Sequence, residues 1–223
     1  MLIIAIDGPS GAGKSTLAKR LAKELRFVYL DTGAMYRALA LKVLRTGVDL
    51  ADDARLGELI RTTDIDLQES DGRLTVLLDG EDVAAKIRTP EVSQMASKVS
   101  ALRSVRRRML ELQRAMGERG SVVAEGRDIG TVIFPEAEVK VFLDASVPER
   151  ARRRYDELKA SGQTVDLDET RREIEERDKR DSERDEAPLR KAEDAILIDS
   201  STVNADEVAA RVLARIRNEL REI

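Results

Sequence analysis

The sequence predicts an α/β protein built on a doubly wound, five-stranded parallel sheet, with a small antiparallel insertion and a helical lid. Two observations carry this prediction. Five apolar runs alternate with segments of helical period, and a glycine-rich motif joins the first run to the first helical segment. The five runs, which read as buried parallel strands, lie at 2–7, 27–30, 121–125, 139–144 and 195–199.

The glycine-rich motif follows the pattern G-x-x-x-x-G-K-S and is a P-loop. Its nine residues form the candidate ATP site: Gly8, Pro9, Ser10, Gly11, Ala12, Gly13, Lys14, Ser15 and Thr16. Glycines let successive backbone N–H groups face an anion, and the following helix adds partial positive charge at its N-terminus. Lys14 can then reach the β- and γ-phosphates, and the Ser15 hydroxyl can ligate Mg²⁺. A chance match in a glycine-rich turn is the alternative, and the strand before the motif argues against it.

The remaining segments fit around this core. Residues 64–88 alternate with period two and carry turn signals, among them Ser70-Asp71-Gly72, so they predict the antiparallel insertion. Two helical segments are expected after Pro90, within 90–117, and a last helix over 204–221 should cover the sheet.

Segment 149–191 is saturated with charge. Its 43 residues include 13 Lys or Arg and 14 Asp or Glu. One interpretation is a solvated helical hairpin with i,i+4 ion pairs. The other is a mobile lid whose arginines fold over phosphates, and the position after the fourth strand favours it. We therefore expect bound nucleotides to order this segment.

Composition narrows the chemistry. The chain has no cysteine and no histidine, so disulfides, thiolate metal sites and a histidine base are excluded. Phosphoryl transfer suits the residues that remain, because positioning and charge neutralisation do most of the catalysis. A net charge of −4 argues against a broad nucleic-acid surface. Without a signal peptide, membrane span or long apolar stripe, we expect a cytoplasmic monomer.

Three further motifs suggest a second substrate. Leu30-Asp31-Thr32-Gly33 follows strand two, and Arg37, one helical turn later, could clamp a phosphate or merely form a surface ion pair. Arg127-Asp128 follows strand three between two glycines, where a plain turn with a local salt bridge is the alternative. Arg177, Asp181 and Arg184 share one helix face, which could also be a solvated face.

Taken together, these motifs resemble bacterial-type cytidylate kinase. The resemblance runs from GPSGAGKST through DTGAMYRA, the GEDV…IRT insertion, EGRDIGTVIFP and ERDKRD to APL at 187–189, which is essentially the whole chain. It implies ATP-dependent phosphorylation of CMP and dCMP, with Mg²⁺. It also implies a core (1–31, 102–148 and 192–223), a monophosphate-binding part (32–101) and a lid with adjoining charged helices (149–191).

The resemblance also implies site residues. Lys14, Arg127 and Arg184 would be catalytic, and Arg153 and Arg154 would be lid contacts to ATP, although a solvated helix explains this last pair equally well. The residues that would bind CMP are Thr32, Arg37, Ser97, Arg106, Arg127, Asp128, Arg177, Asp181 and Arg184. Among them, Arg106, Asp128 and Ser97 would face the base, Arg177 and Asp181 the sugar, and Arg37, Arg127 and Arg184 the phosphate side.

The choice of base can be argued from chemistry. Cytosine offers an amino donor at N4 and acceptors at N3 and O2, which an Asp–Arg pair complements. Uracil would set a carbonyl against the carboxylate and an N–H against the guanidinium, at a cost of about 1–3 kcal/mol for each mismatched group. Two alternatives remain: another small-molecule kinase of this fold, for UMP, dTMP or shikimate, and a nucleotide-dependent switch or assembly ATPase.

Overall fold

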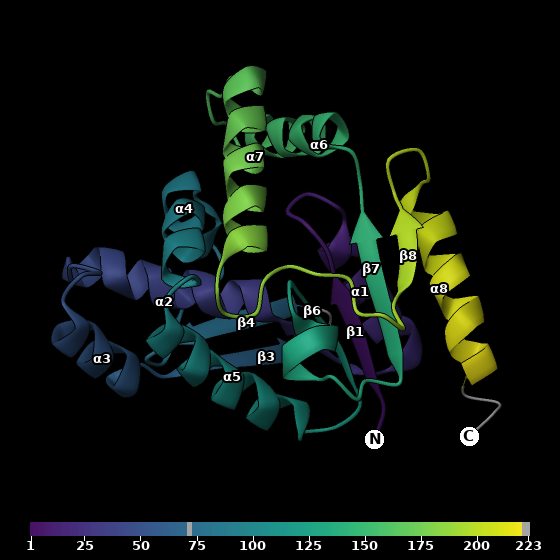
Figure 1. Ribbon diagram of the computed structural model, residues 1–223, viewed down its shortest axis with the longest axis horizontal. Helices are drawn as coiled ribbons and strands as arrows, with labels where there is room; N and C mark the ends of the chain where they lie inside the picture. The colour runs from purple at the N-terminus through teal and green to yellow at the C-terminus, as the bar shows by residue number, and fades with distance from the viewer. Residues whose placement is uncertain (71–72, 220–223) are drawn as a thin grey trace.

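The computed structural model describes residues 1–70 and 73–219, and its centre is a five-stranded parallel sheet (Figure 1). The strands lie in the order β2-β6-β1-β7-β8. Their bounds are β1 (Ile3–Asp7), β2 (Val28–Asp31), β6 (Val122–Gly126), β7 (Val139–Asp144) and β8 (Ile196–Asp199). Each predicted run is therefore confirmed as a strand. Because every pair is parallel, the strand ends that precede the P-loop and the Asp31 and Arg127 motifs meet at one edge.

Helices cover both faces of this sheet. One apolar core joins β2, β6 and part of β1 to α2, α4 and α5, and a second joins the other sheet face to α1 and α8. The helices are α1 (Lys14–Leu25), α2 (Thr32–Thr46), α3 (Asp53–Thr62), α4 (Pro90–Val99), α5 (Arg103–Gly117), α6 (Val147–Ala160), α7 (Leu167–Glu183) and α8 (Ala205–Glu219). The two predicted helices after Pro90 are α4 and α5.

The predicted insertion is confirmed as a second, antiparallel sheet. It comprises β3 (Ile65–Ser70), β4 (Arg73–Leu78) and β5 (Glu81–Asp82), and a short helical turn, η1 (Lys86–Arg88), follows it. Val76 and Leu78 pack into the core that α2 lines, so the small sheet extends that core. The predicted Ser70-Asp71-Gly72 turn includes residues outside the described part of the chain.

Capping residues fix where the site-bearing helices begin. Asp31 ends β2, and its Oδ1 accepts from the Ala34 N–H at 2.8 Å, which caps α2. Thr89 caps α4 through the Val92 N–H, and Pro90 takes the first helical position, where no amide donor is needed. The predicted helix at 204–221 is α8, and the last two of those residues lie outside the described chain.

The charge-rich segment forms two packed helices, α6 and α7, beyond the carboxyl ends of β7 and β8 (Figure 1). Helix α7 also contacts α4, so it spans the space between the main sheet and the part of the chain that carries the insertion. Over residues 1–70 and 73–219, no helix combines the length and apolar character that a membrane span needs.

Candidate active site

The P-loop wraps tightly between β1 and α1. Gly8, Gly11 and Gly13 all have positive φ angles, and a Cβ on Gly8 would lie 1.9 Å from the Leu143 carbonyl oxygen. No other residue type fits at Gly8 without moving β7. Buried Ala12 anchors the loop through its carbonyl, which accepts from the Ser200 hydroxyl at 2.8 Å. The loop thus has the fixed, open backbone curvature that an anion cradle requires.

Lys14 lies at the centre of this cradle with its side chain almost wholly buried. Its Nζ donates to the Pro9 carbonyl at 2.7 Å, and the residue is 6 % exposed. The pKa of Lys14 is lowered to about 7, chiefly by burial and also by the nearby Arg127 guanidinium, while Glu125 opposes both effects. The protein therefore does not fully compensate the positive charge of this ammonium group, as expected for a group that binds phosphate oxygens.

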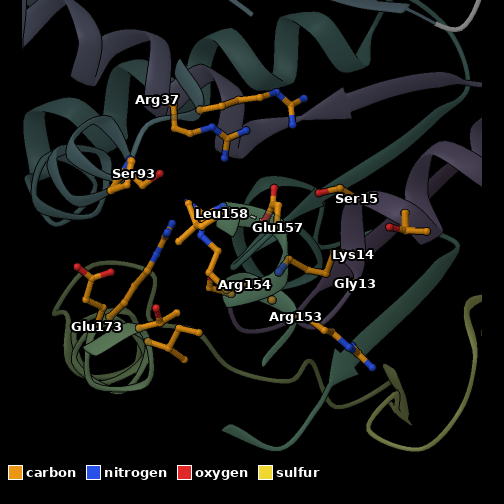
Figure 2. Close-up of a pocket in the computed structure, with 18 of the residues that line it drawn as sticks. Gly13, Lys14, Ser15, Arg37, Ser93, Arg153, Arg154, Glu157, Leu158 and Glu173 are labelled. Atoms are coloured by element: carbon orange, nitrogen blue, oxygen red, sulfur yellow. Dashed lines mark hydrogen bonds and ion pairs between the residues drawn. The ribbon is translucent and has the colours of Figure 1, made fainter. Parts of the chain in front are cut away.

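A cavity of about 390 Å³ opens in front of the P-loop. Ser10, Gly11, Gly13, Lys14, Ser15 and Thr16 line one side of it, and α6 and α7 line another. Figure 2 shows Arg37 on the far side of this cavity from Lys14 and Ser15. We call it the donor cavity. Gly8, Pro9 and Ala12 hold the loop from behind rather than lining it.

The two candidate ATP contacts from α6 differ in placement. Arg153 lines the rim, but its guanidinium points away from the cavity (Figure 2) and donates to Glu149 at 2.9 Å and to the Ser200 hydroxyl at 3.2 Å. Arg154 borders the cavity and pairs with Glu157 at 2.8 Å. Of the two guanidinium groups, that of Arg153 is therefore the one held away from the cavity by partners outside it.

A second cavity, of about 150 Å³, adjoins the first. Lys14, Ser15, Arg37 and Arg177 line both cavities. We call the second one the acceptor cavity. It brings together eight of the nine residues expected to bind the monophosphate: Thr32, Arg37, Arg106, Arg127, Asp128, Arg177, Asp181 and Arg184.

Ser97 is the one that does not line the acceptor cavity. It is buried in α4, and its hydroxyl accepts from Arg180 Nη1 of α7 at 2.7 Å. Ala96 and Ser100 stand at the cavity wall instead. The sequence pattern did not single out Arg180, which lies among many charged residues of α7, and nothing in its local spacing distinguishes it.

Buried ion pairs organise the acceptor cavity. Arg127 Nε donates to Asp181 Oδ2 at 2.9 Å, and Arg106 Nη2 pairs with Asp128 Oδ2. The alternative of a local Arg127–Asp128 salt bridge is thus replaced by two longer-range pairs. Burial would raise the pKa of Asp181, but Arg127 and Arg177 outweigh it and hold that pKa below its usual value. The helix face that bears Asp181 is therefore not a solvated face.

Two arginines of this cavity keep unused donors. Within the described chain, Arg177 Nε and Arg184 Nη2 are buried and make no hydrogen bond; their nearest carboxylate oxygens, on Asp181 and Asp128, lie at 3.9 and 3.6 Å. Burial lowers the pKa of Arg177 to about 10, with Arg127 adding to the effect, and burial also lowers that of Arg184. Unsatisfied buried donors of this kind fit an anionic ligand.

Arg177 and Arg184 lie in different surroundings. Arg177, expected at the sugar, lines both cavities close to Lys14 and Arg127. Arg184, expected on the phosphate side, lies beside Asp128 and Arg106, and its Nε is held by the Ala187 carbonyl at 2.8 Å. The prediction that both lie on one helix face is wrong for Arg184, because α7 ends at Glu183 and Arg184 follows it with an extended backbone (φ −63°, ψ 142°). Spacing alone does not show which end of the cavity each residue reaches.

Arg106, Asp128 and Tyr36 lie close together in the wall of the acceptor cavity. The Arg106 guanidinium lies 6.0 Å from the centroid of the Tyr36 ring and also donates to the Ser100 carbonyl at 3.3 Å. Burial raises the pKa of Asp128, and the guanidinium groups of Arg106 and Arg184 limit that rise. A carboxylate and a guanidinium side by side in a closed pocket can read the donor and acceptor pattern of a base edge.

Carboxylates at the strand ends brace the site, and the sequence motifs did not identify them as functional. Glu125 is buried at the end of β6 and accepts from the Tyr29 hydroxyl; burial raises its pKa, and Asp31 raises it further. Its backbone carbonyl accepts from the Thr32 hydroxyl at 2.7 Å. A carboxylate near the carboxyl end of a buried parallel strand is the signal that the sequence offers.

Asp7, at the end of β1, holds the turn that carries Arg127 and Asp128. Its two carboxylate oxygens accept from the Ile129 N–H at 2.7 Å and the Gly130 N–H at 2.8 Å. These amides begin a π-helical turn, η2 (Ile129–Ile133). Burial raises the pKa of Asp7 to about 6; the two amides oppose this, Asp128 reinforces it, and Lys14 opposes it.

We expect the stabilising effect of Asp7 to depend on pH. A carboxyl group whose pKa is raised by folding contributes stability that is complete below its unfolded pKa and is lost as the pH rises through its folded value. The free energy of unfolding of the wild type, relative to that of Asp7→Asn, should therefore fall by about 3 kcal/mol between about pH 4 and about pH 7. Denaturant titrations of both proteins at each pH measure this difference, in which the contributions of the other carboxyl groups cancel. A difference that does not change with pH would contradict the role of burial.

The sheet order, the P-loop and the paired cavities define the class of protein: a P-loop kinase with donor and acceptor sites at one sheet edge. In a search of solved structures, an uncharacterized protein from Eubacterium ventriosum shares the fold, with a TM-score of 0.53 at 16% identity over 97% of this chain and 99% of that one.

Sequence comparisons place the chain within this class. The cytidylate kinase family model matches residues 4–218. The cytidylate kinase of Syntrophotalea carbinolica is 58% identical over 95% of this chain and 90% of that protein. The cytidylate kinase of Pelotomaculum thermopropionicum is 53% identical over 98% of this chain and 97% of that protein. The chain belongs to the cytidylate kinase family.

Proposed function

We propose that this protein transfers the γ-phosphoryl group of ATP to CMP, and to dCMP, giving ADP and the cytidine diphosphate. One observation carries the proposal: Lys14, Arg37 and Arg177 line both the donor and the acceptor cavity, and a buried Arg106–Asp128 pair lines the acceptor cavity alone. A site that only hydrolysed ATP would have no use for a second, base-reading cavity.

The donor cavity would hold ATP with its phosphates against the P-loop. Backbone N–H groups and Lys14 would neutralise the β- and γ-phosphates. The base would lie near Arg153 at the rim, with Arg154 facing the phosphates. These contacts use charge that the protein itself leaves uncompensated at Lys14.

The same wall suits Mg²⁺. The Ser15 hydroxyl and the Asp31 carboxylate line both cavities. Mg²⁺ keeps several of its water ligands in proteins, so these two oxygen ligands suit it. No cluster of three or more acidic side chains is found in the described part of the chain, so substrate phosphates would complete the ligand set. Bound there, Mg²⁺ would supply charge neutralisation across the β- and γ-phosphates.

The transfer would be a direct in-line displacement. A phosphate oxygen of CMP forms a bond to the γ-phosphorus as the bond from that phosphorus to the bridging oxygen of ADP breaks, so no covalent enzyme intermediate is needed. Arg37 and Arg127 would hold the acceptor phosphate. Lys14 and Arg177, which line both cavities, would stabilise the charge on the transferring group.

The nucleoside of CMP would occupy the rest of the acceptor cavity. Asp181 would face the sugar, with Thr32 at the cavity wall, while Asp128, Arg106 and Arg184 surround the base end. Ser97 would reach the base only if its hydroxyl turned from Arg180, or used its own proton toward the base.

Three parts would move relative to one another. We assign the core to 1–31, 102–148 and 192–223, the monophosphate-binding part to 32–101, and the lid with its adjoining helices to 149–191. Closure of α7 over both cavities would exclude water, which protects ATP from hydrolysis. We further propose a cytoplasmic monomer that binds no nucleic acid, in keeping with the net charge of −4. The scattered positions of the exposed large apolar side chains among the described residues also fit a monomer.

A coupled assay of ADP formation with a panel of acceptors tests this function. We expect turnover with CMP and dCMP to exceed that with UMP and dTMP by about tenfold or more, because mismatched buried groups carry a penalty for each contact. Shikimate and a reaction without acceptor should give only background. Equal turnover of CMP and UMP would remove the base-reading role, and ADP formation that needs no acceptor would favour an ATPase.

A further inference from the structure

One buried arginine outside the expected site joins the P-loop to the lid. Arg150 lies in the first turn of α6 and is 4 % exposed. The sequence offers no reason to separate it from the other basic residues of this charge-rich segment. Its surroundings, however, differ from theirs, because its partners come from three different parts of the chain.

The guanidinium of Arg150 bonds in three directions. Nε donates to the Ala145 carbonyl after β7 at 2.8 Å, and Nη1 donates to the Ser10 carbonyl in the P-loop at 3.1 Å. Nη2 pairs with Asp178 Oδ2 of α7 at 2.6 Å. A planar guanidinium fixes these directions relative to one another, which a lysine cannot do. These contacts thereby fix the position of α7 relative to the P-loop.

The P-loop also packs directly on this residue. A Cβ on Gly11 would lie 3.1 Å from the Arg150 Cβ, so the loop backbone can approach α6 this closely only with glycine there. A change in the loop on nucleotide binding would therefore reach Arg150 both through the Ser10 carbonyl and through this contact.

Asp178 connects Arg150 to the cavities, because it directly follows Arg177 in α7. Arg177 lines both cavities and keeps an unused donor, as described above. Asp178 Oδ1 is buried without a hydrogen-bond partner in the described chain, so the pair with Arg150 is the main compensation of this carboxylate. The turn of α7 that carries Arg177 is thus held by Arg150.

We infer that Arg150 is a positioning residue that couples nucleotide binding in the P-loop to the placement of α7, and so aims Arg177 at the transferring phosphoryl group. The inference rests on the proposed function for the identity of the substrates. The coupling itself concerns only the P-loop and α7, and it can be measured with the donor nucleotide alone.

Hydrogen exchange of residues 167–183, with and without a non-hydrolysable ATP analogue, measures the coupling. In the wild type we expect the analogue to increase protection of this helix. In Arg150→Met we expect that increase to be lost while the analogue still binds, because the link from Ser10 to Asp178 is cut. An increase in Arg150→Met equal to that of the wild type would overturn the inference, whatever happens to its thermal stability.

Turnover supplies a second readout. We expect kcat of Arg150→Met to fall on the order of tenfold to a hundredfold with a smaller change in KM for CMP, since Arg37, Arg106 and Asp128 of the acceptor cavity lie outside α7. Arg152→Met is the matched control: it lies on the same helix, is exposed, and pairs with Glu149 and Asp156 away from Ser10. It should match the wild type in both measurements.

A double-mutant cycle separates coupling from general damage. Asp178→Leu should reproduce the loss of protection, and the double variant with Arg150→Met should lose no more kcat than the worse single variant. If the double variant loses kcat by the product of the two single factors, the two residues act independently and the inference is overturned. If Arg150→Met fails to fold, Arg150→Lys is the substitute. It keeps the charge but cannot bond to Ser10 and Asp178 at the same time, so it should show the same lost protection.

The outcome of the hydrogen-exchange experiment does not depend on which acceptor the protein uses. If the wild type phosphorylates none of the monophosphates, the proposed function fails, while the exchange experiment with the ATP analogue still decides the role of Arg150. If CMP is phosphorylated but α7 responds to the analogue equally in all variants, the proposed function stands and the coupling through Arg150 does not.

Discussion

Replacement of Lys14 by alanine should lower kcat by at least about a hundredfold and leave the fold intact, because a preorganised charge at the transferring phosphoryl group is lost. The Lys14 ammonium is buried with a backbone carbonyl as its hydrogen-bonded partner, and burial lowers its pKa to about 7. The folded protein therefore holds this charge at a cost, so its removal should not reduce the melting temperature.

Steady-state kinetics and thermal melting of the same samples test this result. Lys23→Ala provides the control, since Lys23 is an exposed lysine in the last turn of the same helix. Lys14→Met adds a variant of similar side-chain volume without the charge. If Lys14→Ala keeps more than about a tenth of the wild-type kcat, the electrostatic role assigned to Lys14 is wrong.

The parts of the fold that the sequence predicts are those fixed by local pattern. Strands buried on both faces read as nearly continuous apolar runs, which is why the runs at 2–7 and 121–125 can be recognised without knowing their neighbours. The P-loop is equally local, because its glycines, lysine and serine lie within nine residues. Parallel strand order then brings the Arg37 and Arg127 motifs to the same edge.

The partners of the charged residues could not be predicted in the same way. With 13 basic and 14 acidic residues in 149–191, many pairings are equally plausible from spacing alone. Tertiary packing decides that Asp181 pairs with Arg127 of another element and that Asp178 pairs with Arg150. The same holds for Ser97, whose hydroxyl meets Arg180 across the space between α4 and α7. Local periodicity contains no information about such contacts.

The base end of the acceptor cavity gives the sharpest test of chemistry in this site. Asp128 is 4 % exposed and is held between Arg106 and Arg184, so its carboxylate has little freedom to rotate. A carboxylate fixed in this way can accept from the cytosine amino group but meets the uracil O4 with like polarity. Water cannot readily relieve that mismatch in a buried site.

We therefore expect Asp128→Ala to bring the CMP to UMP ratio of kcat/KM close to unity, a loss of about 1–3 kcal/mol in discrimination. ATP binding should change little, because Asp128 does not line the donor cavity. Asp128→Asn provides the second variant, since it keeps the shape beside Arg106 and can turn its amide N–H₂ toward the base. That group would donate to the uracil O4, so this variant should use UMP better than Asp128→Ala does.

The base ratio separates two roles that loss of activity alone would confuse. If Asp128 served only to neutralise Arg106 and Arg184, its removal would lower kcat/KM for both monophosphates by the same factor and would lower the melting temperature, since two buried guanidinium groups would lose their partner. If Asp128 reads the base, the two factors differ, and the asparagine variant shifts the ratio further toward UMP. An unchanged ratio in a variant that stays folded would assign base selection to other groups of the cavity, with Arg106 and Ser100 at the same wall as the next to test.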